Sequence, residues 1–212
     1  MSGLVLTDEP SGTPLAGLLF APGSRGKIDT PGWDVLASTL VGLGYLSVRF
    51  ELPYRATGRK IPPKAQSSVP GFLEALDVVR GEHPGVADWY LGGASYGGRV
   101  ASLAVAAGAT KASGLVFLGY PLHAFGRKDS LRVEHWPQIG VASLFFAGTK
   151  DNMCDLGLLG DCLPTLGAEA TLEVIEGGNH SLGLGRAQPD FAHFAHLIHA
   201  WITSVKKKQK NL

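Results

Sequence analysis

The chain has 212 residues, a net charge of +1 and a hydrophobic content of 45%, with only 17% charged residues. This length suits one sizeable domain and is too short for two. The near-neutral charge argues against nucleic acid as the main partner. No apolar run is long enough to span a membrane, and the N-terminus lacks a basic segment followed by an apolar one. We therefore expect a soluble, cytoplasmic protein without membrane contact.

The C-terminal end carries a short basic run, formed by Lys206, Lys207, Lys208 and Lys210. Terminal runs of one charge are usually solvated and frayed. We therefore expect residues 1–205 to form a single domain and residues 206–212 to form a basic C-terminal tail. Contact of this tail with a membrane or with nucleic acid is the minor alternative.

Cys154 and Cys162 are the only two cysteines in the chain. Two cysteines make no disulfide framework, and a reducing compartment leaves them as free thiols. They also fall short of the ligand set of a zinc site. We expect neither a metal nor a cofactor.

Short aliphatic or β-branched runs alternate with segments of helical periodicity along the chain. The expected strands are 15–20, 45–50, 89–92, 115–119, 141–147 and 172–175. The expected helices are 33–42, 71–80, 98–107 and the closing segment from Phe191 to Trp201. Continuous apolar strands separated by helices indicate an α/β protein, with a mostly parallel sheet of about six or seven strands covered by helices on both faces. Binding sites in such sheets lie at the carboxyl ends of the strands.

Ser95 lies in the turn Gly93-Ala94-Ser95-Tyr96-Gly97, between an expected strand and an expected helix. This is the context that the G-x-S-x-G nucleophile turn of the α/β-hydrolase fold requires. The turn is sharp, and Gly93 and Gly97 supply the small residues that it needs two positions before and after the serine. We therefore predict an α/β-hydrolase fold with Ser95 as a catalytic nucleophile. An ordinary turn serine is the alternative.

A serine nucleophile needs a base that takes its proton and an acid that orients the base. In this fold the acid and then the histidine follow the serine along the chain. Asp151 comes directly after the strand at 141–147, and His180 lies in a glycine-rich loop before the last helix. We predict these two residues as the acid and the base. The alternative for Asp151 is that it caps the next helix, with Asp155 as the rival acid. The alternative for His180 is an ordinary histidine in a surface loop.

The tetrahedral intermediate of acyl transfer needs two backbone N–H donors. One is expected from Tyr96, the residue after the nucleophile, and the other from the loop after the first strand. That loop is Ala21-Pro22-Gly23-Ser24, and we assign the second donor to Ser24, with Gly23 next. A phosphate-binding loop is the alternative, but the G-x-x-x-x-G-K spacing is missing.

Several motifs, taken together, resemble a family of small α/β-hydrolases predicted in bacteria. They are Ala21-Pro22-Gly23, Arg49-Phe50-Glu51-Leu52-Pro53-Tyr54, the serine turn through Arg99, Gly119-Tyr120-Pro121-Leu122-His123, Gly148-Thr149-Lys150-Asp151 and Asn179-His180-Ser181. The likeness runs from about Leu18 to Trp201, and the family is related to the vertebrate testis-expressed hydrolase-like proteins and to a chromatin-complex subunit. It implies a hydrolase. Because some vertebrate relatives serve as interaction subunits, a catalytically silent binding or scaffold protein is the alternative.

The chain departs from this family near the nucleophile. Relatives often have lysine before the serine and methionine after it, where this chain has Ala94 and Tyr96, and many have histidine in place of Pro22. Neither change removes a predicted catalytic group, because the oxyanion donors are backbone N–H groups. The larger Tyr96 side chain does alter the surroundings of Ser95, so the substrate preference of relatives is not carried over.

The segment between the strands at 115–119 and 141–147 is too short for a helical cap domain. An uncapped site is shallow and open, which favours a small-molecule acyl substrate. We therefore expect a serine hydrolase of the esterase, thioesterase or amidase type. Haloperoxidase or lyase chemistry without a cofactor is a further alternative on the same residues.

Four substrate-binding candidates surround the predicted nucleophile, namely Gly23, Arg55, Tyr120 and His123. The loop 51–70 carries Arg55, Arg59, Lys60 and Lys64 against one acid, so an anionic substrate is expected to be attracted there. A solvated loop is the alternative for these cations. Tyr120 and His123 follow a neighbouring strand and are expected at the pocket wall, with loop packing as the alternative.

Overall fold

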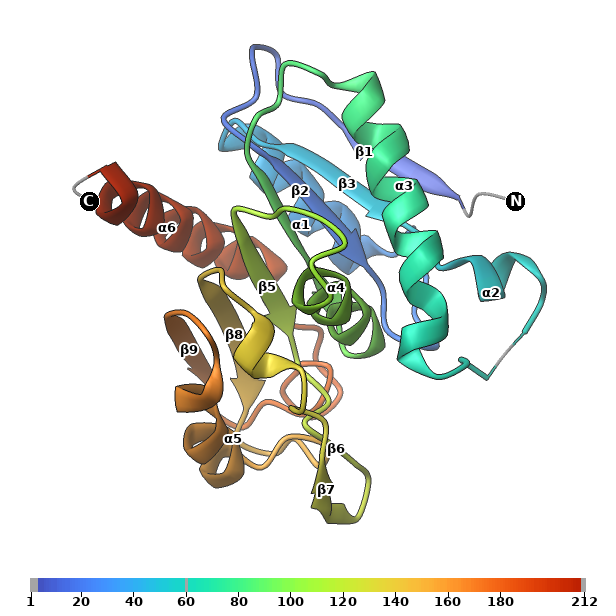
Figure 1. Ribbon diagram of the computed structural model, residues 1–212, viewed down its shortest axis with the longest axis vertical. Helices are drawn as coiled ribbons and strands as arrows, with labels where there is room; N and C mark the ends of the chain where they lie inside the picture. Colours follow the sequence, from blue (N-terminus) through green and yellow to red (C-terminus); the bar gives the residue numbers. More distant parts are fainter. Residues whose placement is uncertain (1–3, 60, 211–212) are drawn as a thin grey trace.

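The computed structural model describes residues 4–59 and 61–210 of the chain. A seven-stranded sheet forms its centre, and every neighbouring pair of strands in it is parallel except the pair at one edge. Across the sheet the strands follow the order β1 (Val5–Asp8), β3 (Leu46–Phe50), β2 (Gly17–Ala21), β4 (Trp89–Ala94), β5 (Gly114–Leu118), β8 (Ser143–Gly148) and β9 (Ala170–Ile175) (Figure 1).

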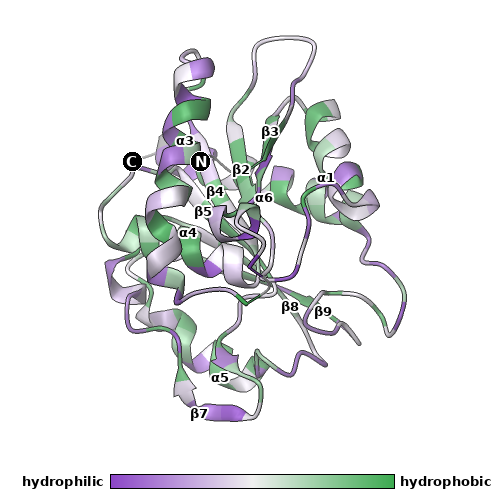
Figure 2. Cartoon of the chain, turned by 90° about the vertical axis from the view of Figure 1, so that its right-hand side faces the viewer, coloured by the Kyte–Doolittle hydropathy of each residue, from purple (hydrophilic) through white to green (hydrophobic). Residues whose placement is uncertain are grey.

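Helices cover both faces of this sheet. One face carries α3 (Val69–Glu82) and α4 (Tyr96–Ala106), and the other carries α1 (Pro31–Gly42) and α6 (Phe191–Lys210) (Figures 1 and 2). The shorter helices are α2 (Pro53–Ala56), α5 (Leu156–Cys162), η1 (Ala65–Ser68), η2 (Trp136–Gln138) and η3 (Leu163–Thr165). Within the described ranges, no helix combines the length and the apolar composition needed to cross a membrane.

The central strands contribute to two separate hydrophobic cores. On β2, Leu18 and Phe20 pack with α1 and α6, whereas Leu19 and Ala21 belong to the core on the α3 and α4 side. This division follows from the strand geometry, because successive side chains point to opposite faces. All five residues of β2 are buried, which explains why the strand appears in the sequence as a continuous apolar run.

The edge strand β1 was not expected from the sequence. It pairs with β3 in antiparallel fashion, and three of its four residues are only half-buried. Its side chains therefore give little hydrophobic signal. The edge is fixed instead by Arg49 on β3, whose guanidinium lies 2.8 Å from the carboxylate of Asp8 and 2.6 Å from that of Asp34.

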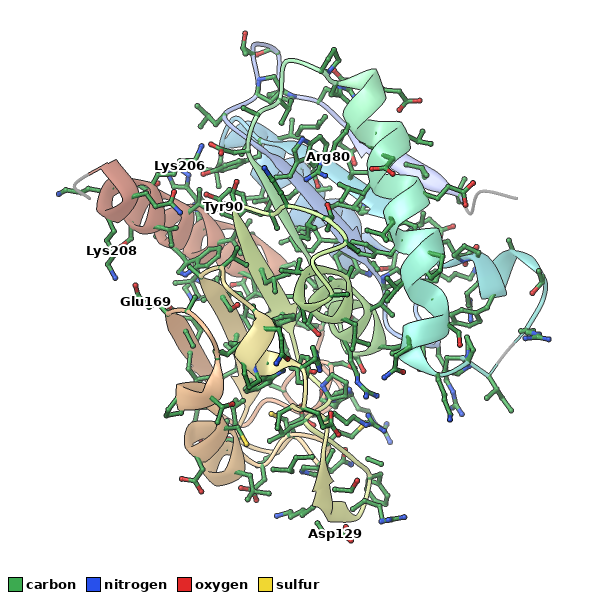
Figure 3. The ribbon with its side chains drawn as sticks, in the orientation of Figure 1. Arg80, Tyr90, Asp129, Glu169, Lys206 and Lys208 are labelled. Carbon is green, nitrogen blue, oxygen red and sulfur yellow. The ribbon has the colours of Figure 1, made fainter. Side chains whose placement is uncertain are left out.

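A small hairpin is the main structure between β5 and β8. It consists of β6 (His123–Ala124) and β7 (Arg127–Leu131). β7 is hydrophilic, and Asp129 lies at the outer end of the hairpin, away from the sheet (Figures 2 and 3). In the described part of the chain there is thus no cap domain over the sheet, in agreement with the prediction.

The helix α6 continues through the basic run at the C-terminal end. Lys206 lies 2.7 Å from the carboxylate of Asp88, and Lys208 pairs with Glu169 beside it (Figure 3). Residues 206–210 are therefore helical and do not form a separate tail. This difference from the expectation has a physical cause, since Val205 still packs in the core and Lys206 and Lys208 each pair with an acidic residue. Residues 211–212 lie outside the described residues.

Candidate active site

Ser95 lies between the end of β4 and the beginning of α4, as the motif predicts. Its backbone has φ 46° and ψ −113°, a conformation that costs a residue with a side chain about 1–3 kcal/mol. The N–H of Ser95 donates to the carbonyl of Leu118 at the end of β5. The turn is therefore held by the neighbouring strand, and the hydroxyl is placed at the carboxyl edge of the sheet.

The glycines of this turn are needed because the end of β2 approaches them closely. A Cβ atom on Gly97 would lie 2.3 Å from the carbonyl oxygen of Ala21 and 2.6 Å from that of Pro22. A Cβ atom on Gly93 would lie 2.0 Å from the same Ala21 oxygen. The nucleophile turn and the predicted oxyanion loop are thus packed backbone against backbone.

The side chains of Ser95, His180 and Asp151 form one connected hydrogen-bonded line. The Ser95 hydroxyl lies 2.8 Å from Nε2 of His180, and Nδ1 of His180 lies 2.9 and 2.8 Å from the two carboxylate oxygens of Asp151. Since the carboxylate only accepts, Nδ1 carries the proton and Nε2 is free to accept from the serine. The Asp151 side chain is fully buried, whereas that of His180 is 21% exposed.

Asp151 and Asp155, the rival acid, have different surroundings. One carboxylate oxygen of Asp151 also accepts the N–H of Met153 at 2.7 Å, which orients it toward His180. Asp155 instead caps α5 by accepting the N–H of Leu158, and it pairs with Lys128. The hydrogen bond from Lys128 holds the pKa of the Asp155 carboxyl below its usual value. Asp155 is thus the helix cap, and Asp151 is the acid that faces the histidine.

The loop that carries His180 is organised by Asn179. Its side chain accepts the N–H of Ser181 at 2.8 Å and donates to the carbonyl of Gly185 at 3.1 Å, and its own N–H donates to Gly183. The loop also lies directly on Gly119, where an added Cβ would be 2.4 Å from the His180 carbonyl oxygen. Asn179 was part of the sequence resemblance but had no assigned role.

The two predicted oxyanion donors lie beside Ser95. Tyr96 is the first residue of α4, and neither its N–H nor that of Ser24 has an acceptor among the described residues. The carbonyl of Ser24 accepts a hydrogen bond of 2.8 Å from the hydroxyl of Tyr54. Burial raises the pKa of Tyr54 to about 12, so this phenol keeps the proton that it donates. Tyr54 thereby positions the Ser24 loop, a role that the sequence did not indicate.

Two hollows meet at Ser95, and Ser24 lines both of them. The first, which we call the apolar hollow, has a volume of about 370 Å³. Its apolar walls are Trp33, Ala94, Leu118, Leu182 and Phe191, and it also contacts Gly23, Arg25 and His180. Gly23 thus lies where it was expected, with space beside it that reaches Ser95.

The second hollow is lined by Tyr96 as well as by Ser95. It has a volume of about 430 Å³ and is lined by three cationic residues, Lys64, Arg99 and Arg132, so we call it the cationic hollow. Lys64 belongs to the basic loop that the sequence singled out. Arg99 and Arg132 were not expected at the site, because nothing in the sequence indicates that the hairpin returns to α4.

Arg55 lies outside both hollows, in contrast to the expectation. It lines a separate outer hollow together with Arg25, Arg59 and Ile61, and its guanidinium pairs with Glu51 at 3.4 Å. The reason is that the chain turns into α2 directly after β3, which carries Arg55 away from Ser95. Lys60 of the same basic loop lies outside the described residues.

Tyr120 and His123 do not line the hollows beside Ser95, and this expectation is wrong. Each is only 1% exposed. Tyr120 packs in the core against Phe117 and Trp136, and its hydroxyl donates to the carbonyl of Arg132 at 2.8 Å. His123 bonds the carbonyl of Ala124 and the N–H of Asp155. Loop packing, the alternative, therefore describes both residues.

Both cysteines are free and buried, as expected of unpaired thiols. Burial, followed by the charge of Asp151, raises the pKa of the Cys154 thiol to about 12. The thiol consequently stays protonated at neutral pH and is a poor nucleophile.

Comparisons with known proteins agree with this architecture. The dienelactone hydrolase of Anabaena variabilis is 19% identical, with a TM-score of 0.74 over 94% of this chain and 90% of that chain. Est1E from Butyrivibrio proteoclasticus, solved with ferulic acid bound, is 14% identical, with a TM-score of 0.72 over 99% and 96%. An alpha-beta serine hydrolase homologue from Coxiella burnetii is 18% identical, with a TM-score of 0.68 over 93% and 88%.

At these identities the solved structures show a shared fold. The family assignment comes from the sequence itself, because the profile of the alpha/beta hydrolase domain matches residues 14–206. That match spans β2 to α6 and therefore includes the serine turn and the loops of Asp151 and His180. The chain belongs to the alpha/beta hydrolase domain family.

Proposed function

We propose that this protein is a serine hydrolase that cleaves an ester, thioester or amide of a small carboxylic acid. One observation carries the proposal: Ser95, His180 and Asp151 are joined by hydrogen bonds of 2.8 to 2.9 Å in the order that proton transfer requires. These three residues come from separate loops, and their alignment has no evident role in packing the fold. A scaffold protein would not need it.

In the proposed reaction, Nε2 of His180 accepts the hydroxyl proton of Ser95 while Oγ forms a bond to the substrate carbonyl carbon. The carbonyl π electrons move to oxygen, and the resulting oxyanion accepts hydrogen bonds from the N–H groups of Tyr96 and Ser24. Collapse of this intermediate breaks the bond to the leaving group, which takes the proton from His180. Water then attacks the acyl-serine by the same steps and releases the acid.

The buried carboxylate of Asp151 supports the charge that forms on the imidazole. It is fully shielded from solvent, so its attraction for an imidazolium is weakly screened. It also fixes the proton on Nδ1, which leaves Nε2 as the atom that faces the serine.

The openness of the site supports a small acyl substrate. In the described part of the chain no cap domain covers Ser95, and the two hollows, of about 370 and 430 Å³, have the volume of small-molecule sites. The structural neighbours include a dienelactone hydrolase and an esterase solved with ferulic acid, and both names refer to small esters or acids.

A fluorophosphonate label and a panel of short p-nitrophenyl esters test this proposal. We expect the wild type to form a covalent adduct on Ser95 and to release p-nitrophenol, and we expect Ser95→Ala to do neither. Ser130→Ala, which changes an exposed serine on β7, is the matched control and should behave as the wild type. Full turnover by Ser95→Ala would overturn the mechanism. A wild type that neither reacts with the label nor cleaves any ester would favour the scaffold protein.

A further inference from the structure

The cationic hollow has an unusual charge distribution for a space beside a nucleophile. Ser95, Tyr96 and Ser24 line it, together with Lys64, Arg99 and Arg132. None of the described residues that line it is acidic. Three cationic residues in a lining without a carboxylate attract anions into the space next to the serine hydroxyl.

Arg99 lies one helical turn after Ser95. Its N–H donates to the Ser95 carbonyl at 3.1 Å, so the two residues lie on the same side of the beginning of α4. The guanidinium of Arg99 forms no ion pair with a described residue, and its Nε atom is buried without a hydrogen-bond partner among them. The guanidinium of this half-buried arginine is therefore not held by any described residue, and Arg99 lines the hollow beside Ser95.

Arg132 lines the same hollow and follows directly after β7 in the chain. Its backbone is fixed twice, because its N–H donates to Leu122 and its carbonyl accepts the hydroxyl of the buried Tyr120, each at 2.8 Å. Its guanidinium has only a long contact of 3.5 Å with the carbonyl of Pro121 and no carboxylate partner among the described residues. The end of the hairpin thus brings a second arginine without a carboxylate partner to the hollow that Arg99 lines.

The two arginines affect one another and a nearby histidine. Burial, followed by the charge of Arg99, lowers the pKa of Arg132. The same two causes lower the pKa of His135 to about 4, so this imidazole is neutral. Ser102 donates its hydroxyl to the Arg99 carbonyl and therefore accepts from Nε2 of His135, 2.8 Å away. Glu134, which raises the pKa of Arg132, is exposed and does not line the hollow.

Arg49 gives an internal comparison. This buried arginine serves the fold, and its guanidinium has Asp8, Asp34 and the carbonyl of Ile28 as partners. Burying charge without such partners is unfavourable. Arg99 and Arg132 are only half-buried and have no carboxylate partner among the described residues, so their guanidinium groups face water or a ligand beside Ser95.

We propose that Arg99 and Arg132 form a carboxylate-binding subsite, so that the substrate is an acyl compound with a carboxylate a few bonds from the scissile carbonyl. This inference rests on the proposed hydrolase function. The planar guanidinium groups match a carboxylate through paired hydrogen bonds, and Lys64 adds charge at the rim. The uncharged part of the substrate occupies the apolar hollow, which Ser95 also lines.

Two pairs of esters test the subsite, each differing only by a methyl group that masks the carboxylate. The first pair is p-nitrophenyl hydrogen adipate and its methyl ester, with the anion on the acyl side. The second is p-acetoxybenzoate and its methyl ester, with the anion on the leaving group. We expect the wild type to prefer the anion in at least one pair by about tenfold or more in kcat/KM, and added salt should reduce the preference.

The variants Arg99→Met and Arg132→Met should each lower this preference toward unity, because the kcat/KM for the anionic ester falls more than that for its methyl ester. Arg127→Met is the control, because its side chain is 66% exposed on β7 and pairs with Asp129. Arg99→Lys retains the charge but loses the planar group, so it should keep an intermediate preference. If circular dichroism shows that Arg99→Met does not fold, Arg99→Lys replaces it as the test of Arg99.

Equal kcat/KM for both members of both pairs in the wild type would overturn the subsite. So would a preference that persists in the double variant of Arg99 and Arg132. Ser95→Ala distinguishes a failure of the subsite from a failure of the proposed hydrolase function. If neutral esters are cleaved in a Ser95-dependent way without any anion preference, only the subsite fails. If Ser95→Ala keeps full turnover, the proposed function itself fails.

Discussion

The hydroxyl of Tyr96 lies 2.9 Å from the hydroxyl of Ser68 and 3.1 Å from the carbonyl of Pro63. Since a phenol has one hydrogen to donate, it donates to Pro63 and accepts from Ser68. The ring also packs edge-on against Tyr54, with the centroids 5.9 Å apart. The residue after the nucleophile thus ties the turn to the segment 63–68, which includes part of the cationic hollow, and to the tyrosine that positions Ser24.

Tyr96→Phe tests this connection. The variant removes both hydrogen bonds and leaves the hydroxyl of the buried Ser68 without this partner, so we expect the free energy of unfolding to fall by about 1 kcal/mol. Urea denaturation measures the loss. Ser68→Ala is the matched comparison and should cost less, because Tyr96 keeps its acceptor at Pro63. Equal stability of Tyr96→Phe and the wild type would show that the connection contributes nothing.

Asp151→Asn separates the orienting role of the carboxylate from its role in the fold. The amide oxygen still accepts the N–H of Met153, so the loop should be retained. His180, however, loses the charge that fixes its proton, and we expect kcat for ester hydrolysis to fall by roughly 10²- to 10⁴-fold. Asp155→Asn weakens only a helix cap and a surface ion pair, so its kcat should match the wild type. Comparable losses in both variants would contradict the assignment of Asp151.

Gly97→Ala should damage the fold and the site together. The new methyl group would overlap the carbonyl oxygens of Ala21 and Pro22, and backbone atoms cannot move aside cheaply. We expect a loss of about 3 kcal/mol or more in the free energy of unfolding, measured by urea denaturation. Gly160→Ala, in an exposed and open position of α5, is the control and should stabilise the protein by up to about 1 kcal/mol.

His135 predicts a pH dependence of stability. Its pKa is about 4 in the folded protein against an ordinary value of 6.5, so the unfolded chain binds the proton first as the pH falls. The neutral His135 side chain therefore contributes to the free energy of unfolding above about pH 6.5, and this contribution is lost as the pH falls toward 4. In the wild type the free energy of unfolding should decrease between about pH 7 and pH 5. We expect this decrease to be smaller by about 1 kcal/mol in His135→Gln, after allowance for the partial exposure of His135. Urea denaturation at several pH values measures the free energy of unfolding of both proteins. If this free energy depends on pH in the same way in both, the prediction is refuted.

The parts of the fold that the sequence predicted correctly are those with a strong local signal. The six parallel strands are fully or largely apolar, and the serine turn combines a strand, two glycines and a helix. Asp151 and His180 were predicted because the fold places them directly after particular strands. In each case a short stretch of sequence determines both the local structure and its position in the sheet.

The errors concern side chains whose position depends on distant contacts. Tyr120 and His123 follow a strand that ends at the site, but the hairpin turns both of them into the core. Arg132 comes to the site through that same hairpin, which has no apolar pattern of its own. Arg99 stands next to a recognised motif, yet its role depends on the absence of an acidic partner in three dimensions, which the sequence does not display.

The backbone of Ser95 has a further consequence for how this chain is maintained by natural selection. At φ 46° a glycine would relieve the strain, so the most direct mutation toward a more stable protein is one that deletes the hydroxyl. A chain retained only for its shape would drift toward that mutation. Keeping serine there means carrying a permanent loss of stability at one residue, and ester hydrolysis is the benefit we propose in return.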